Sequence, residues 1–318
     1  MEKNKTWRIW ENVPFPTFMD TVTNDDSVYL LCPEEFEIMY GCDYRSYMSR
    51  AKTADIVFGS FSLDFHKKHT NLLDCKNVKL HLWDNYFLYY AIQSWEDFSI
   101  QNKPITNLFT CMNHRAHPYR VTFVDQLAKH DLLKDNFISW HYVDAHIIKQ
   151  FEYWTPKKVY LDGKQNPPKQ ELFPEQMYNS LINVVTESNI WSPFITEKTY
   201  NSIIGLKPFI IWGYPGSHAY LEKIGFKMHH DIIDYSFDVI KNNVTRCDMI
   251  MKELKRLSTI DFSATNNSMK EILNYNRQHA INIARSRIAV PDIVFKDNYY
   301  VNLMENVECK LRLLEQAS

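Results

Sequence analysis

Glycine is scarce in this chain, which has 7 glycines among its 318 residues. Four of them, Gly205, Gly213, Gly216 and Gly225, lie close together in the second half. Phosphate-binding loops of the GxxxxGKS type and dinucleotide-binding turns of the GxGxxG type need glycines at fixed spacing, and neither pattern occurs. The sequence therefore excludes P-loop NTPases and dehydrogenases with the ordinary dinucleotide turn.

Paired cysteines, a basic excess and long apolar runs are also missing. The 6 cysteines include no CxxC pair and no Cys/His spacing typical of zinc sites, which favours reduced thiols in a cytosolic protein. Lys plus Arg (36) does not exceed Asp plus Glu (38), so we expect no nucleic-acid partner. Because neither a signal peptide nor an apolar run of membrane-spanning length is found, we expect a cytoplasmic protein without a membrane span.

Short apolar runs alternate with amphipathic stretches, which is typical of an α/β protein. The expected strands cover residues 27–32, 54–60, 78–83, 105–111, 180–188 and 207–213. The expected helices include 119–133, 193–206 and 245–257, and a polar turn is expected over 112–118. A polar stretch containing Pro104 predicts a division into two domains, residues 1–105 and 106–318.

The most informative segment is TESNIWSPFITEKTYNSIIGLKPFIIWG, residues 186–213. It predicts a strand end, a helix beginning near Pro193, and a second strand ending at Gly213. Ligands bind at the carboxyl ends of parallel strands, and a helix N-terminus favours a phosphate. Lys198 would add a full positive charge there, and Glu197 can accept hydrogen bonds from sugar hydroxyls.

This segment resembles the donor-binding motif of the α1,3-fucosyltransferases. Glu187 falls at the Glu of the family's FENS sequence, Phe194 at its Tyr, and Thr196, Glu197 and Lys198 at its Thr-Glu-Lys, without a gap. Two weaker matches lie upstream. Residues 111–120 resemble the family segment that brings an Arg to the donor diphosphate, and residues 55–65 resemble a stretch of its acceptor domain.

The resemblance implies an inverting glycosyltransferase of GT-B-like α/β fold, with two facing Rossmann-like domains and the cleft between them. Residues 1–105 would form the acceptor side, and residues 106–318 would bind the nucleotide sugar. Glu197 would hold the donor ribose, while Lys198 and Arg120 would hold the diphosphate. The expected donor-binding residues are Asn113, Arg115, Arg120, Glu187, Ser188, Asn189, Phe194, Thr196, Glu197 and Lys198.

The chain departs from the family pattern at two donor contacts. Ser188 replaces the Asn of FENS and Phe194 replaces the Tyr, while Asn189 is placed to compensate for the first change. These departures concern the base and the sugar rather than the diphosphate. The partners implied are therefore a GDP- or UDP-sugar, most simply GDP-fucose, and a glycan acceptor.

An inverting transfer needs a carboxylate that takes the proton of the acceptor hydroxyl. The family's Glu falls on Ser62, which cannot serve as a base. Asp64 lies two residues further on and is the expected base, and Asp84, after a predicted strand, is the runner-up.

The chain contains no Asp-x-Asp, the metal-chelating device of the other large glycosyltransferase class. Arg115, Arg120 and Lys198 can neutralise a leaving diphosphate instead, so we expect no cofactor and no required metal. Three alternatives stay open at this point: the same scaffold with another donor such as UDP-xylose, a non-catalytic nucleotide or sugar binder, and a nucleic-acid-modifying transferase.

Overall fold

A computed structural model places most of the chain. The residues it describes are 3–8, 15–33, 44–70, 72, 74–95, 104–115, 117–134, 136–142, 175–260, 266–287, 290–296 and 298–316. The predicted surface loop over 154–172 lies outside them.

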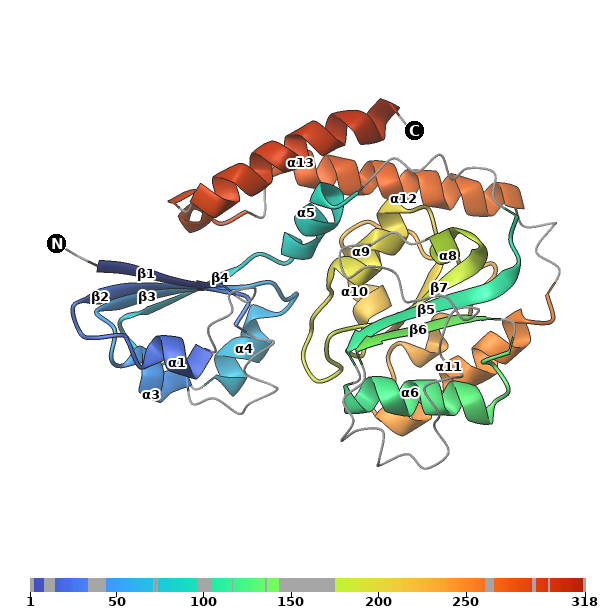
Figure 1. Ribbon diagram of the computed structural model, residues 1–318, viewed down its shortest axis with the longest axis horizontal. Coiled ribbons are helices and arrows are strands. Elements are labelled where there is room, and N and C mark those ends of the chain that lie inside the picture. Colours follow the sequence, from blue (N-terminus) through green and yellow to red (C-terminus); the bar gives the residue numbers. More distant parts are fainter. Residues whose placement is uncertain are drawn as a thin grey trace.

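The first half is built on a four-stranded parallel sheet in the order β1-β2-β3-β4. Its strands are β1 (Lys3–Arg8), β2 (Asp26–Leu31), β3 (Thr53–Phe58) and β4 (Val78–Leu82). The helices of this half are α1 (Phe15–Met19), α3 (Tyr44–Met48), α4 (Leu63–His69) and α5 (Tyr86–Gln93). Figure 1 shows α1, α3 and α4 on one face of the sheet, while α5 leads toward the second half.

The second half contains another four-stranded parallel sheet, in the order β6-β5-β7-β8. Its strands are β5 (Asn107–Arg115), β6 (Phe137–Tyr142), β7 (Ser180–Thr186) and β8 (Phe209–Trp212). The α-helices are α6 (Pro118–Lys129), α8 (Glu175–Tyr178), α9 (Glu197–Ile204), α10 (Ser217–Lys223), α11 (Asn243–Leu257), α12 (Asn266–Ser286) and α13 (Asn298–Gln316). Two short 3-10 helices are η3 (Tyr235–Phe237) and η5 (Asp292–Lys296).

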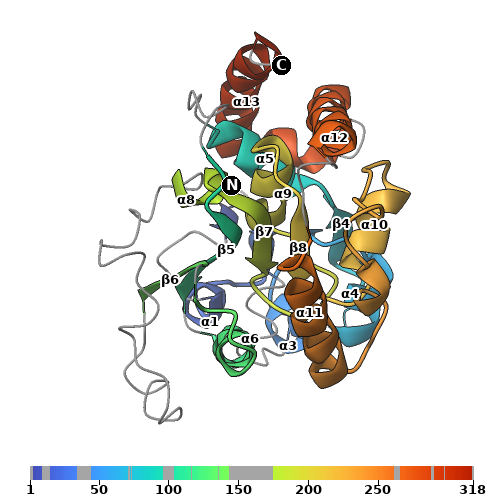
Figure 2. The same ribbon diagram turned by 90° about the vertical axis from the view of Figure 1, so that its right-hand side faces the viewer.

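Helices cover both faces of this second sheet. Both views place α6 and α11 on one side and α9 and α12 on the other (Figures 1 and 2). Such coverage explains why β7 and β8 consist mainly of buried apolar residues instead of alternating polar and apolar ones. The α/β class and the two Rossmann-like, parallel-sheet halves expected for a GT-B-like fold are confirmed.

Three local predictions need correction. β5 continues to Arg115, because its register with β6 extends through the stretch expected to be a polar turn. Helix α9 begins at Glu197 rather than near Pro193, because Thr196 supplies the N-cap. The strand β1 (Lys3–Arg8) was not expected from its polar sequence KNKTWR.

The two halves meet around the ends of β3, β4 and β7. Ser60 forms an isolated antiparallel bridge with Phe194, and the Phe61 N–H donates to the Pro193 carbonyl at 3.0 Å. The apolar core also crosses between the halves, since α5 packs against α9 and α13 packs against α5. The two sheets lie on either side of the predicted boundary at residue 105. One apolar cluster lies wholly in the first half, and the other contains residues of both halves.

Candidate functional site

The connection from β7 to α9 carries the motif singled out in the sequence. The carboxylate of Glu187 is fully buried just after β7. It accepts hydrogen bonds from the Thr196 N–H (3.1 Å), the Thr196 hydroxyl (2.5 Å) and the Thr199 hydroxyl (2.6 Å). A carboxylate at a helix N-terminus satisfies free donors and interacts favourably with the helix dipole. Glu187 therefore holds α9 against β7, and its role as a donor contact stays a prediction.

Lys198 lies at the centre of a small polar cluster at this helix N-terminus. Its Nζ lies 2.8 Å from Glu197 Oε1, 3.2 Å from Thr196 Oγ1 and 3.3 Å from Ser188 Oγ. The Lys198 side chain is 25% exposed and that of Glu197 is 10% exposed. The structure thus brings together Ser188, Thr196, Glu197 and Lys198 as the sequence predicts, with a cation that reaches solvent.

Two other predicted donor contacts are occupied in the protein's own packing. Phe194 is fully buried and packs edge-to-face against Phe87 of α5, with ring centroids 5.1 Å apart. The Asn189 side-chain oxygen accepts from the Ser192 N–H at 3.0 Å and from the Trp191 N–H at 3.2 Å, which closes the turn after β7. Both residues shape the loop that presents the Lys198 cluster.

Arg120 also faces the interior rather than solvent. It is buried on α6, and its guanidinium donates to the Glu187 carbonyl (3.0 Å and 3.2 Å) and the Thr186 carbonyl (3.1 Å). A diphosphate would have to compete with these bonds to reach Arg120, and the expected clamp role stays a prediction. Arg120 therefore secures the end of β7 by donating to the backbone carbonyls of Thr186 and Glu187.

The remaining predicted donor residues lie on β5. Asn113 is buried and accepts from the Thr186 hydroxyl at 2.5 Å, which ties β5 to β7. Arg115 is the last residue of β5, and its side chain lies outside the described part of the structure.

The two candidate bases have different surroundings. Asp64, in the first turn of α4, has a side chain that is 95% exposed and lies 3.7 Å from Lys67. Asp84 follows β4, is half-buried, and accepts a hydrogen bond from the Tyr220 hydroxyl at 2.7 Å. Tyr220 lies on α10 of the other half and was not singled out from the sequence, because no local pattern marks a contact between residues so far apart in the chain.

Tyr119 is a second residue that sequence reasoning missed. Its hydroxyl donates to the carbonyls of Glu187, at 3.2 Å, and Ser188. The weak resemblance over residues 111–120 drew attention to the start of α6, but it singled out Arg120 and not the neighbouring Tyr119. Tyr119 and Arg120 together fix the backbone beneath the Lys198 cluster.

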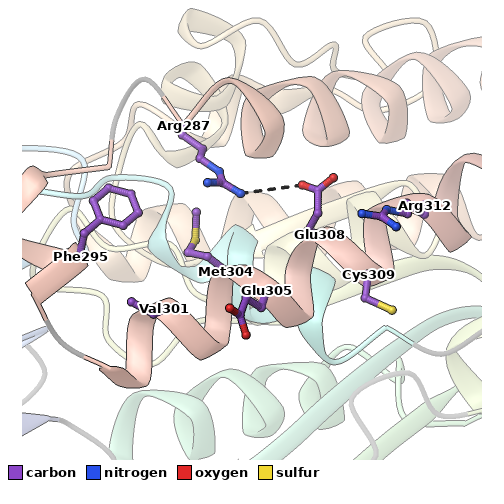
Figure 3. Close-up of a pocket in the computed structure, with 8 residues that line it drawn as sticks. All are labelled: Arg287, Phe295, Val301, Met304, Glu305, Glu308, Cys309 and Arg312. Atoms are coloured by element: carbon purple, nitrogen blue, oxygen red, sulfur yellow. Dashed lines mark ion pairs between the residues drawn. The ribbon is translucent and has the colours of Figure 1, made fainter.

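A surface cavity of about 440 Å³ lies away from these residues. It is formed by the end of α12, η5 and α13 (Figure 3). Its lining residues are Arg287, Phe295, Val301, Met304, Glu305, Glu308, Cys309 and Arg312. None of the residues predicted to bind donor or acceptor lines it, so it does not belong to the candidate site.

Metal ligands and membrane-spanning segments were sought throughout the described residues. No cluster of three or more His, Cys, Asp or Glu side chains suited to a metal ion is found within them. The helices of the same residues include none that is both long enough and apolar enough to span a bilayer.

Comparisons with known proteins give two similar solved structures. No protein-family model matches the chain, and no curated protein sequence matches it. One similar structure is the DNA-modifying enzyme β-glucosyltransferase, solved in the presence and absence of its substrate uridine diphosphoglucose. Its TM-score is 0.45 at 12% identity, over 92% of this chain and 76% of that one. The other is T4 phage BGT in complex with UDP and Mn²⁺, with a TM-score of 0.40 at 13% identity, over 98% of this chain and 82% of that one.

One expectation from the sequence is corrected by these comparisons. The sequence predicts no cofactor and no required metal for this chain, and the second structure, which holds Mn²⁺ together with UDP, contradicts that prediction.

Proposed function

We propose that this chain is a glycosyltransferase that binds a nucleoside-diphosphate sugar at the N-terminus of α9. The observation that carries the proposal is the position of Lys198. Its ammonium group is partly exposed at the carboxyl edge of a parallel sheet, beside the hydroxyls of Ser188 and Thr196. Ligands of open α/β sheets bind at this edge, and a diphosphate matches the charge offered there.

The chemistry of transfer explains why a lysine is useful at this place. When the bond between the anomeric carbon and the diphosphate breaks, negative charge grows on the leaving oxygen. A cation held beside that oxygen stabilises the transition state more than the ground state. The Glu197 carboxylate, 2.8 Å from Lys198 Nζ, orients the ammonium group, and in this proposal it accepts hydrogen bonds from ribose hydroxyls.

The donor and the stereochemistry are finer parts of the proposal. They rest on the similarity of residues 186–213 to the α1,3-fucosyltransferase motif, which favours GDP-fucose, inversion at the anomeric carbon, and a glycan hydroxyl as acceptor. UDP-sugars are the alternative donors, because Lys198 and Glu197 would contact only the diphosphate and ribose that both nucleotides share.

The test is nucleotide binding by calorimetry, with UDP, GDP, UDP-glucose and GDP-fucose, each measured with Mn²⁺ and with a chelator. Lys198→Ala should weaken binding about tenfold to a hundredfold, since one charge-assisted contact is worth roughly 1.5–3 kcal/mol. Lys198→Arg, which keeps the charge, should retain most of the affinity. The matched control is Lys252→Ala, which removes a surface lysine of α11 that pairs with Asp248 at 2.7 Å. Failure of the unaltered chain to bind any of the four compounds would overturn the proposal.

A further inference from the structure

Asp84 and Tyr220 come from different halves of the molecule and meet where the halves contact each other. Asp84 lies just after β4, at the carboxyl edge of the first sheet, while Tyr220 lies on α10 of the second half. The Tyr220 hydroxyl donates to Asp84 Oδ2 at 2.7 Å. This hydrogen bond leaves Oδ1 of the same carboxylate for another hydroxyl group.

The ring of Tyr220 is held by residues of both halves. Phe61 stacks on it with centroids 4.4 Å apart and an interplanar angle of 14°. Phe61 is itself anchored to the second half. Its N–H donates to the Pro193 carbonyl, and its ring packs edge-to-face against Tyr214, with ring centroids 6.2 Å apart. The hydroxyl of Tyr220 therefore has a fixed position relative to Asp84.

Three buried polar atoms, two on the chain neighbours of Asp84 and one on α9, lack hydrogen-bond partners within the described part of the chain. Trp83 Nε1, Asn85 Oδ1 and Tyr200 Oη find no hydrogen-bond partner among the described residues. Trp83 and Asn85 flank Asp84 in the chain, and Tyr200 lies on α9, which begins with the Lys198 cluster. Buried polar groups are normally paired, and of these three atoms Tyr200 Oη is the one linked to this contact, because the charge of Asp84 acts on the Tyr200 hydroxyl.

Charge effects agree with this arrangement. Burial, followed by the charges of Asp84 and Glu187, raises the pKa of Tyr200. Burial, followed by Tyr200 and Asp84, raises the pKa of Tyr220 as well. The raised pKa keeps the Tyr220 hydroxyl protonated, as its hydrogen bond to Asp84 requires.

We infer that Asp84 is the catalytic base of the proposed transfer and that Tyr220 is the positioning residue that aims it at the acceptor hydroxyl. The inference rests on the proposed function. In the step, the acceptor oxygen forms a bond to the anomeric carbon while its proton passes to Asp84 Oδ1. The bond between that carbon and the diphosphate oxygen breaks, and its electron pair leaves with the nucleoside diphosphate. Asp84 afterwards returns the proton to solvent.

The alternative base, Asp64, lacks these features. Its carboxylate is almost fully exposed, and its ion pair with Lys67 of the same helix spans 3.7 Å. A base that is oriented before the substrate arrives transfers a proton more effectively than one that samples many rotamers in water.

The inference is tested by the rate of donor hydrolysis, with water as the acceptor and UDP-glucose and GDP-fucose as donor probes. Asp84→Asn should lower kcat by about 10²–10⁴-fold, the usual contribution of a positioned base. Tyr220→Phe keeps the stacked ring and removes only the hydroxyl, so it should lower kcat by about tenfold with little change in KM. Tyr275→Phe is the matched control, because it also removes a tyrosine hydroxyl, which donates to the Gly225 carbonyl at 3.2 Å.

A double-mutant cycle separates positioning from general damage to the fold. Once Asp84 is replaced by Asn, removing the Tyr220 hydroxyl should cause no further loss of kcat, because no base is left to aim. If kcat of the double variant falls by the product of the two single losses, the inference is overturned while the proposed function stands. An unchanged kcat in Tyr220→Phe has the same consequence. No hydrolysis of either donor by the unaltered chain, together with no nucleotide binding, would overturn the proposed function first and this inference with it.

Discussion

The hydroxyl of Thr196 forms hydrogen bonds with one acidic side chain, Glu187, and one basic side chain, Lys198, and these two residues have different roles. It donates to the buried carboxylate of Glu187 and accepts from the ammonium group of Lys198. The Glu187 carboxylate accepts from the Thr196 N–H and from the hydroxyls of Thr196 and Thr199, whereas Lys198 reaches solvent. Replacing the two residues should therefore affect different measurements, stability for Glu187 and ligand affinity for Lys198.

Glu187→Gln should destabilise the fold by about 1.5–3 kcal/mol, because the amide nitrogen would face donors that now meet a carboxylate. The measurement is the free energy of unfolding in urea. Glu222→Gln is the matched control, because Glu222 is a largely exposed residue that bonds to His230 at 2.6 Å, and it should change stability by less than about 1 kcal/mol. Unchanged stability in Glu187→Gln, with weaker nucleotide binding, would instead favour the donor contact that the sequence resemblance implied.

The candidate site could be predicted from the sequence only in part. The spacing of Thr196, Glu197 and Lys198 after a buried strand was enough to predict a polar cluster at the start of a helix, and that cluster is present. The inward direction of Arg120 and Phe194 could not be predicted, because a side chain at a strand or helix end turns toward whichever tertiary partner fills the space. Arg120 finds the carbonyl oxygens at the end of β7, and Phe194 finds Phe87.

At the scale of elements, the buried strands were the most predictable parts of the fold. β7 and β8 lie inside the predicted runs 180–188 and 207–213, because strands covered on both faces consist of continuous apolar residues. β1 gives no such signal, since its first four residues, KNKT, are all polar or charged. Its pairing depends on a partner strand, β2, that the local sequence does not reveal.

Asp26 is one of the links between β1 and β2, and it predicts a pH dependence of stability. The hydrogen bond from Lys5 of β1, with further bonds from Thr23, lowers the pKa of Asp26 from 3.8 to about 2. A lowered pKa in the folded state stabilises the fold above pH 3.8 and loses that contribution as the pH falls toward 2. The urea midpoint of the parent chain should exceed that of Asp26→Asn above pH 4, and the difference should shrink between pH 4 and pH 2.

The control for this titration is Asp20→Asn. Asp20 also forms an ion pair, with Arg50 at 3.4 Å, but both partners are exposed. Exposed pairs contribute little to stability, so the midpoint of Asp20→Asn should follow that of the parent chain at every pH. A constant difference between Asp26→Asn and the parent chain over the whole range would contradict the assigned role of the carboxylate.

At the scale of the whole molecule, α13 connects the end of the chain to the region where the halves meet. Figure 1 shows this helix running across the top of the molecule toward the first half. It packs against α5, which in turn packs against α9, the helix that carries Lys198. Tyr300, at the start of α13, contacts the rings of Trp83 (5.6 Å) and Tyr29 (6.3 Å) in the first half. The stability of both halves should therefore depend on this one helix.

Two leucines of α13 test that dependence, because Leu311 is 1% exposed and Leu313 is 45% exposed. Leu311→Ala should destabilise the chain by about 2–5 kcal/mol through lost burial and a residual cavity. Leu313→Ala makes the same chemical change on the same helix without opening the core, so it controls for helix propensity and should cost less than about 1 kcal/mol. Since one core spans α5, α9 and α13, far-ultraviolet circular dichroism and tryptophan fluorescence should report a single coincident transition for both variants. Separate transitions in Leu311→Ala would mean that the halves unfold independently and that α13 stabilises only the part it covers.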